Sequence, residues 1–155
     1  MSAYADGLRL IAARELSEAD LRARLVDRDH PPEQIDAAIE RLKETGAVDD
    51  RRVARAYART ASKVKGRGRL RVARELQTMG IARDVITEAV AEVFGDLDER
   101  SLIDRALQKK LRGGKKPTTV RERARLYQYL MRQGFTPAAV SVALRKLGGR
   151  GGEDE

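Results

Sequence analysis

The residues of this chain with the clearest capacity for chemistry are its arginines and lysines, which gather in two separate blocks. Residues 51–76 hold ten basic side chains against one acid, and residues 100–125 hold ten against two. By contrast, residues 1–50 hold seven basic and twelve acidic side chains, and residues 77–99 hold one and six. The formal net charge is +8. Positive charge segregated in this way indicates a surface that binds an anionic partner, such as nucleic acid or an acidic protein.

Within the first basic block, four cations recur every four residues and form a stripe along one side of a predicted helix. They are Arg51, Arg55, Arg59 and Lys63, with Val53, Ala54, Tyr57, Ala61 and Val64 expected on the opposite side. Like charges at this spacing destabilise an isolated helix by about 0.2–0.5 kcal/mol per pair. We therefore expect the stripe to bind anions, with a solvated arginine face as the alternative.

The groups that catalysis would require are missing from this sequence. It has no cysteine and one histidine, which excludes disulfides, thiolate nucleophiles, cysteine zinc sites and any site that needs two histidines. His30 is expected to be a turn or packing residue, and Ser17 and the Asp49-Asp50 pair are expected to cap helices. No HExxH, GxSxG or dinucleotide motif occurs, and the glycine-rich loop at Lys115 lacks the Walker A spacing. We expect a protein that is not an enzyme and uses no cofactor or metal.

The elements that position the cations are predicted to be short amphipathic helices. Aromatic residues make up 4% of the 155 residues and charged residues 36%, and alternating strand patterns are absent from the sequence. Five apolar positions at helical spacing recur three times: Leu21, Leu25, Ile35, Ile39 and Leu42; then Val72, Leu76, Ile86, Val90 and Val93; then Leu126, Leu130, Val140, Leu144 and Leu147. The sequence therefore predicts an all-α fold, an elongated tandem array of three helix-turn-helix-like repeats with about nine helices.

Each repeat is predicted to contain a leading helix and then two helices joined by a tight turn. The turns fall at Asp29-His30, Gly80-Ile81 and Gly134-Phe135, where glycine suits a positive φ and the next apolar residue packs beneath the turn. The leading helices are expected over Ala3–Glu15, Asp50–Val64 and Glu99–Leu111. The repeats are expected to span 1–46 (net acidic), 47–96 (strongly basic) and 97–148 (basic), followed by a frayed tail over 149–155.

The repeat also places arginines at matching positions of the second and third copies. Arg67, Arg69 and Arg71 correspond to Arg121, Arg123 and Arg125, whereas the first copy has Leu16, Glu18 and Asp20 there. Helix N-termini carry free N–H groups and a positive dipole end, which favour phosphate or carboxylate. We therefore predict one basic face on the second and third repeats: Arg51, Arg55, Arg59, Lys63, Arg67, Arg69, Arg71, Arg74, Arg121, Arg123 and Arg125, with a basic loop of Arg112, Lys115 and Lys116.

Four segments of the chain together resemble a known family. The segment Asp49-Asp50-Arg-Arg-Val53-Ala54-Arg-Ala-Tyr57, followed by Gly66-Arg-Gly68-Arg-Leu-Arg71-Val72-Ala-Arg-Glu75-Leu76-Gln-Thr-Met-Gly80-Ile81, is similar to the central signature of RecX regulatory proteins. Arg14-Glu-Leu-Ser17-Glu-Ala-Asp-Leu21 and Leu130-Met-Arg-Gln-Gly134-Phe135 match it as well, so the resemblance covers nearly the whole chain. The departures are Val53 in place of the usual Phe, and Asp29-His30 in place of Gly and an apolar residue.

The resemblance implies a tandem three-helix modulator of the RecA recombinase. Such proteins bind RecA and its filament on single-stranded DNA and suppress strand exchange, ATP hydrolysis and co-protease activity, and so act on DNA repair and the SOS response. Duplex DNA is a further candidate ligand. Two alternatives from the residues themselves are a direct, non-sequence-specific DNA-binding helical protein and a scaffold for acidic proteins. Because the sequence contains no secretory signal and no long apolar run, we expect a cytoplasmic protein without membrane contact. We also expect a monomer.

Overall fold

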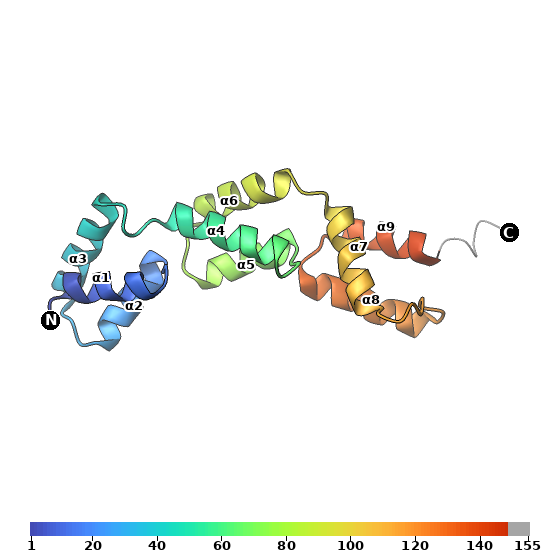
Figure 1. Ribbon diagram of the computed structural model, residues 1–155, viewed down its shortest axis with the longest axis horizontal. Helices are drawn as coiled ribbons and strands as arrows, with labels where there is room; N and C mark the ends of the chain where they lie inside the picture. The colour runs from blue at the N-terminus through green and yellow to red at the C-terminus, as the bar shows by residue number, and fades with distance from the viewer. Residues whose placement is uncertain (149–155) are drawn as a thin grey trace. The chain divides into compact units, whose positions relative to one another are not determined.

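A computed structural model of the chain describes residues 1–148, and the predicted tail over 149–155 lies outside the described residues. All regular secondary structure in the described range is helical (Figure 1). The nine helices of this range are α1 (Ala3–Ala13), α2 (Glu18–Asp27), α3 (Pro32–Glu44), α4 (Asp50–Lys63), α5 (Arg69–Thr78), α6 (Arg83–Gly95), α7 (Glu99–Lys110), α8 (Val120–Gln133) and α9 (Pro137–Gly148). The predicted all-α tandem array is therefore confirmed, and the three leading helices begin at their predicted residues.

Local capping explains where the first helices begin. The Ser17 hydroxyl accepts a hydrogen bond from the backbone N–H of Asp20 (3.1 Å) and caps α2, as predicted. Asp49 Oδ1 accepts from the backbone N–H of Arg51 (3.0 Å) at the start of α4. Pro32 occupies the first turn of α3, where its missing N–H has no helical partner to lose.

The three turns have the backbone conformation that the repeat predicts. Asp29, Gly80 and Gly134 all have positive φ, at 65°, 78° and 100°. Ile81 and Phe135, which follow the two glycines, are buried. Of the fifteen apolar repeat positions, all but Val90 and Leu147 are buried, so the shared pattern corresponds to the cores of the repeats.

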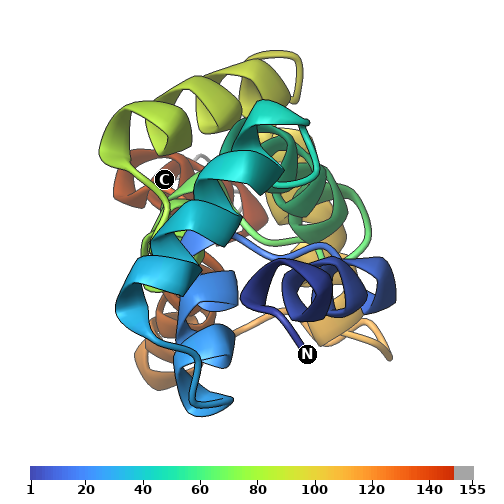
Figure 2. The ribbon, with the colours of Figure 1, turned by 90° about the vertical axis from the view of Figure 1, so that its left-hand side faces the viewer.

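The chain divides into two compact units, and the division cuts through the helices of the second repeat. The first unit comprises Met1–Tyr57 with Glu75–Ala89, and the second comprises Ala58–Arg74 with the chain from Val90 onward. In the first unit, α1, α2 and α3 pack together around a leucine- and isoleucine-rich core. Figure 2 shows these three helices nearest the viewer.

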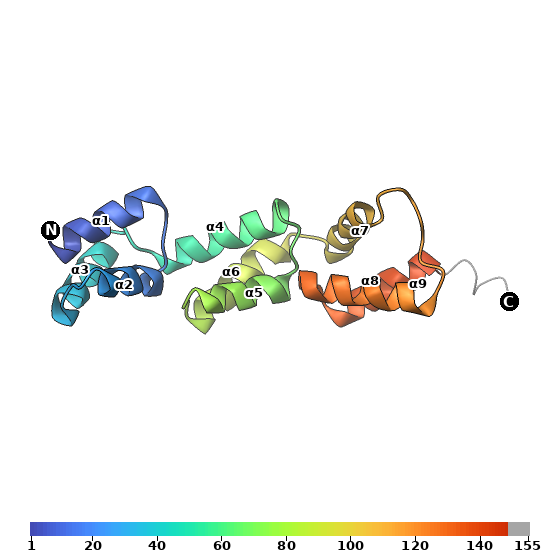
Figure 3. The same cartoon turned by 90° about the horizontal axis from the view of Figure 1, so that it is seen from below.

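In the second unit, α9 packs against both α7 and α8 around a core that includes Ile103, Leu130 and Phe135. All three side chains are fully buried. Figure 3 shows α8 and α9 side by side, with the loop after α7 leading into the start of α8. This loop and the exposed sides of α7 and α8 carry the second basic block.

Each unit also contains one junction between consecutive repeats, and the two junctions match. In the first unit, the Ser17 hydroxyl donates to the carbonyl oxygen of Met79 (2.7 Å). In the second unit, the backbone N–H of Gly68, at the position equivalent to Ser17, donates to the carbonyl oxygen of Gln133 (2.7 Å). The start of a second helix thus docks on the turn of the following repeat in both units.

Candidate nucleic-acid interface

The α4 stripe faces acids that the sequence pattern did not reveal. Arg51 forms an ion pair with Glu88, and the Arg59 guanidinium lies 3.6 Å from a carboxylate oxygen of Glu92. Both acids lie on α6, one helical turn apart, so they oppose two of the four stripe cations. The stripe has no acid interleaved on its own helix, but two of its cations are offset by acids from another helix. Whether the stripe binds anions stays a prediction.

The other stripe positions differ from Arg51 and Arg59. Arg55 is half-buried and Lys63 is exposed, and neither makes an ion pair with a described residue. Val64, expected on the apolar side, follows the last residue of α4 and is 76% exposed. That expectation was wrong because the helix ends before Val64 can turn inward.

The arginines around the start of α5 do not form one continuous row. Arg67 precedes the helix, and its backbone N–H donates to the carbonyl oxygen of Ala61 (2.9 Å). Arg71 is half-buried, and its Cβ would lie 2.3 Å from a Cβ added to Gly134. Arg71 thus belongs to the repeat junction, whereas Arg69 and Arg74 are exposed on α5.

The matching arginines of α8 are divided between two sides of that helix. Because successive residues rotate by about 100°, residues two apart point in nearly opposite directions, and residues four apart align. Arg121 and Arg125 accordingly line one groove, whereas Arg123 lines a different hollow with Arg100 and Lys146. The predicted grouping of all three on one face was therefore wrong.

A groove beside α8, here called the α8 groove, brings together four of the predicted site residues, Lys115, Lys116, Arg121 and Arg125. It has a volume of about 1240 Å³ and lies between the α7–α8 loop and α8. Its cationic side chains are Lys110, Lys115, Lys116, Arg121, Arg125 and Arg132. Two of the three predicted loop cations line it; Arg112 is exposed elsewhere on the loop.

A second groove, here called the α7 groove, continues the basic surface. It has a volume of about 590 Å³ and contains no carboxylate among its lining residues. Its cations are Lys63, Lys65, Arg105, Lys109 and Lys110. Lys110 and Tyr129 line both grooves, so the two share a wall within the second unit. Together the grooves present ten cationic side chains and one carboxylate, Glu122.

The ten groove cations are available for a ligand. None of them forms an ion pair with a described residue, in contrast to Arg51 and Arg59 of the α4 stripe. The one acid is engaged in a helix cap: Glu122 accepts from the backbone N–H of Thr118 (2.7 Å), while its own N–H donates to the Thr119 hydroxyl (3.1 Å). The Thr118 hydrogen bond lowers the pKa of Glu122. Glu122 therefore stays charged but is held at the start of α8.

Several groove residues lie outside the predicted set. They are Lys65, Arg105, Lys109, Lys110 and Arg132; the first four belong to the two basic blocks, whereas Arg132 lies beyond them. Lys109 and Lys110 end α7, where cations also suit the helix dipole, so their positions in the sequence do not by themselves mark them as ligand-binding residues. A helical projection of α7 and α8 is the signal that would have found them.

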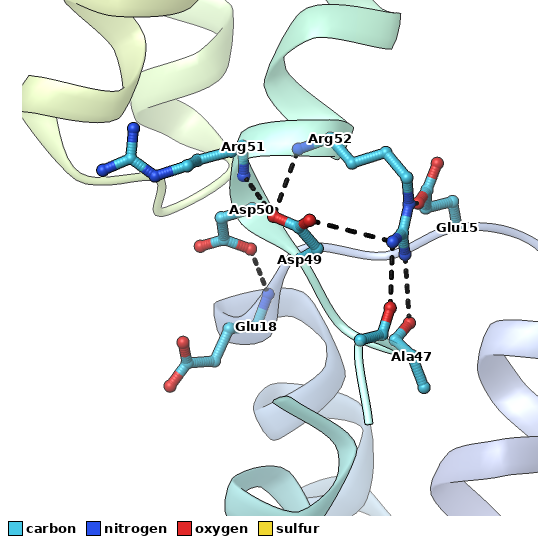
Figure 4. A network of polar contacts seen from close by, with 8 residues as sticks. Glu15, Glu18, Ala47, Asp49, Asp50, Arg51 and Arg52 are labelled. Atoms are coloured by element: carbon cyan, nitrogen blue, oxygen red, sulfur yellow. Dashed lines mark hydrogen bonds and ion pairs between the residues drawn. The ribbon is translucent and has the colours of Figure 1, made fainter. Parts of the chain in front are cut away.

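The first unit uses its charged residues in a different way, shown in Figure 4. At the repeat junction, Asp50 Oδ1 accepts from the backbone N–H of Glu18 (2.8 Å), and burial raises the pKa of Asp50. Arg52 pairs with Glu15 and donates to the carbonyl oxygens of Gly46 and Ala47. These charges satisfy one another and the backbone.

The single histidine takes part in a buried network of the first repeat. Asp6 is 4% exposed on α1, and its two oxygens lie 2.8 Å from His30 Nε2 and 3.0 Å from an Arg28 nitrogen. The hydrogen bond with His30 lowers the pKa of Asp6, and the Arg28 charge acts in the same direction. His30 is thus a packing residue of the turn, as predicted.

Among residues 1–148, no helix is long and apolar enough to cross a membrane, and no cluster of three or more histidine or acidic side chains could hold a metal ion. The candidate site is the pair of basic grooves in the second unit. Such a surface can neutralise phosphates or carboxylates, and it contains an aromatic ring.

Comparison with known proteins agrees with this architecture. Three family models match in chain order: the first three-helix domain of RecX over residues 3–42, the second over 49–90 and the third over 98–148. The chain is 34% identical over 136 residues to the regulatory protein RecX of Halorhodospira halophila, covering 88% of this chain and 82% of that protein. It is also 34% identical to RecX of Pseudomonas savastanoi pv. phaseolicola, covering 94% and 89%.

Solved structures show the same fold. The crystal structure of RecX from Lactobacillus salivarius matches with a TM-score of 0.78 at 17% identity, covering 94% of each chain. The fold and the site define an all-α tandem-repeat protein with basic grooves, similar to proteins named as regulators. The chain belongs to the RecX family.

Proposed function

We propose that this protein binds RecA and its filament on single-stranded DNA and inhibits the recombinase, ATPase and co-protease activities, thereby modulating DNA repair and the SOS response. The observation that carries the proposal is the basic surface of the α7 and α8 grooves, whose cations make no ion pair within residues 1–148, in a chain of the RecX family. A filament of protein on DNA offers both acidic side chains and phosphates. We further propose that the protein acts as a cytoplasmic monomer and is not an enzyme; the relatives' name as regulatory proteins supports the last point.

The proposed mechanism is a difference in affinity between filament states. A ligand shifts a conformational equilibrium only by as much as it binds one state better than another. The groove takes its cations from two elements, such as Arg121 from α8 and Lys115 from the loop before it, and loops as a class are more mobile than helices, which suits a partner surface that changes between states. Binding would then oppose filament growth or favour disassembly.

The test is the DNA-dependent ATPase activity of the cognate RecA, titrated with this protein from far below equimolar amounts. Wild-type protein is expected to inhibit, and the groove variant Arg121→Gln/Arg125→Gln is expected to lose most of that inhibition. The matched control is the stripe variant Arg51→Gln/Arg59→Gln, which removes the same charge from ion-paired positions. Wild-type potency in the groove variant would contradict the proposed site, and no inhibition by wild-type protein at low salt would contradict the proposed function.

A second candidate function is direct, non-sequence-specific DNA binding without any effect on RecA. It is favoured by the absence of acids other than Glu122 from the groove linings. Binding of DNA combined with an unchanged RecA ATPase activity would select it.

A further inference from the structure

We infer that the α7 and α8 grooves form one path for single-stranded nucleic acid, in which the Tyr129 ring stacks on a base. The inference deepens the proposed function, since it names the ligand of the same basic surface. It rests on how Tyr129 is placed with respect to the cations of both grooves.

Tyr129 is the point where the two grooves meet. Its side chain is half-buried and lines both of them, as does Lys110. The Lys110 ammonium lies over the Tyr129 ring, 4.8 Å from its centroid. One face of the ring is therefore in contact with a cation that itself lines both grooves.

A nucleotide offers a counterpart for both residues of this pair. A base can stack on the ring face, which alanine substitution in other proteins shows to be a substantial source of affinity. The phosphate of the same nucleotide can take the Lys110 ammonium, which otherwise makes a cation–π contact with the ring. An acidic protein surface would satisfy Lys110 but would gain nothing from the ring.

The surroundings of Tyr129 suit a continuous backbone of phosphates. Lys63, Lys65 and Lys109 lie on the α7 side of the shared wall, and Arg121 and Arg125 lie on the α8 side. Cations on both sides of a single stacking residue are the arrangement expected for a nucleic-acid strand whose backbone passes across the Tyr129 ring. A duplex is a poorer fit, because its base faces are hidden within the helical stack.

The neighbouring Tyr127 supplies a matched control on the same helix. It too is partly buried against the core of the third repeat. It lies two residues from Tyr129, hence on nearly the opposite side of α8, and lines neither groove. Loss of Tyr127 removes similar packing without removing the proposed stacking surface.

The experiment compares two fluorescent probes of about 20 nucleotides by anisotropy, an oligothymidine and an abasic strand with the same number of phosphates. Tyr129→Ala is expected to weaken oligothymidine binding roughly 5- to 100-fold, the range that loss of one stacking contact gives, and to leave abasic-strand binding unchanged. Tyr129→Phe should bind both probes as wild type does, and so should Tyr127→Ala. Helicity by circular dichroism shows whether each variant is folded.

Equal weakening for both probes by a folded Tyr129→Ala variant, or no weakening, would overturn the inference. Failure of wild-type protein to bind oligothymidine would also overturn it, even if RecA ATPase inhibition persisted and the proposed function stood. Conversely, Tyr129-dependent binding without ATPase inhibition would uphold the inference and contradict the proposed function. Preference for oligodeoxyuridine over oligouridine, which share a base and differ only in the sugar, identifies DNA as the strand, and the reverse preference identifies RNA; both support the stacking site.

Discussion

The first and third repeats share a three-helix scaffold but differ at the turn between the second and third helices. In the third repeat, Gly134 is buried in the junction and Phe135 is fully buried beneath the turn. In the first repeat, Asp29 takes the positive φ while exposed to solvent, and His30 is held by the buried Asp6. Glycine is required at the third turn because the start of a neighbouring helix docks on it. At the exposed first turn, Asp29 can take the glycine position, and the His30–Asp6 pair can replace the buried apolar residue.

The two repeats also differ in how they use charge. In the first repeat, Arg22 pairs with Asp36 at 2.6 Å and Lys43 with Glu18 at 3.5 Å. The third-repeat cations that line the grooves make no ion pair with a described residue. The same scaffold therefore carries charges that mainly satisfy one another in one copy, and charges that remain available to a ligand in another.

The largest expected effect on stability comes from the residue beneath the third turn. Phe135→Ala should lower the free energy of unfolding by about 3–5 kcal/mol, because it leaves a cavity in a filled core. His30→Ala should lower it by about 1–3 kcal/mol, the cost of leaving a buried polar partner unsatisfied. Urea denaturation followed by circular dichroism measures both. Equal losses of unfolding free energy in the two variants would contradict the claim that the third turn depends more on its buried apolar residue than the first turn does on His30.

The next effect concerns the close approach at Gly134. Gly134→Ala should destabilise the protein by about 3 kcal/mol, since the added Cβ would overlap the Cβ of Arg71 in addition to the strain of positive φ. Gly113 is the control: its φ of 105° is similar, but nothing lies within 4 Å of an added Cβ. Gly113→Ala should cost only about 1–2 kcal/mol. Thermal unfolding of the two variants separates the cost of steric overlap with Arg71 from the cost of positive φ. Identical losses of stability would show that the junction at Gly134 can move to accommodate a Cβ.

A smaller effect links the first repeat to pH. Because the folded-state pKa of Asp6 lies below its ordinary value of 3.8, Asp6 stabilises the fold above that value, and this stabilisation is lost as pH falls through the lower folded pKa. Asp6→Asn should destabilise the protein by about 1–2 kcal/mol at neutral pH and by less in acid. Denaturation midpoints between pH 7 and about pH 3 measure the difference. A difference that grows toward acid would contradict the sign.

Asp50 provides a carboxylate with the opposite direction in the same unit. Its folded pKa is raised, so the charged form is disfavoured by folding and Asp50 contributes less stability as pH rises through that pKa. Asp50→Asn keeps an acceptor for the backbone N–H of Glu18. The Asp50→Asn variant should therefore lose no more stability at neutral pH than in acid. Asp6→Asn, by contrast, should lose more at neutral pH. Denaturation midpoints over the same pH range measure both.

The smallest effect is expected at the α4 stripe. The stripe variant Arg51→Gln/Arg59→Gln removes two exposed ion pairs, which typically contribute about 0–1 kcal/mol each. Urea denaturation in low and high salt should show a slight loss that salt reduces. A loss above the range given for His30→Ala would mean that the stripe is a structural network of greater weight than exposed pairs usually are.

The sequence predicts the parts of this fold that depend on local pattern. Caps such as Ser17 and turn residues such as Gly134 act over a few positions, and the apolar spacing is periodic. The helices and their three turns are therefore predictable without any tertiary information. The same reasoning identifies two blocks of cations but not their use.

The ion pairs and grooves depend on tertiary packing, which sequence spacing does not encode. Arg51 meets an acid 37 residues away, and no local pattern announces that contact. Lys65 and Lys109 join one groove only because a loop and a helix end come together. The division of Arg121 from Arg123 was accessible in principle, since it follows from helical geometry alone.

The central claim, that the groove cations and not the ion-paired Arg51 and Arg59 of the α4 stripe contact the ligand, is tested most directly by salt dependence. The measurement is the slope of log affinity for oligothymidine against log salt, in wild-type protein, the groove variant and the stripe variant. Each phosphate contact on a single strand contributes about −0.7 to this slope. The groove variant Arg121→Gln/Arg125→Gln should make the slope shallower by about 1.4, two contacts' worth, while the stripe variant keeps the wild-type slope. A shallower slope in the stripe variant, with the groove variant unchanged, would contradict the account.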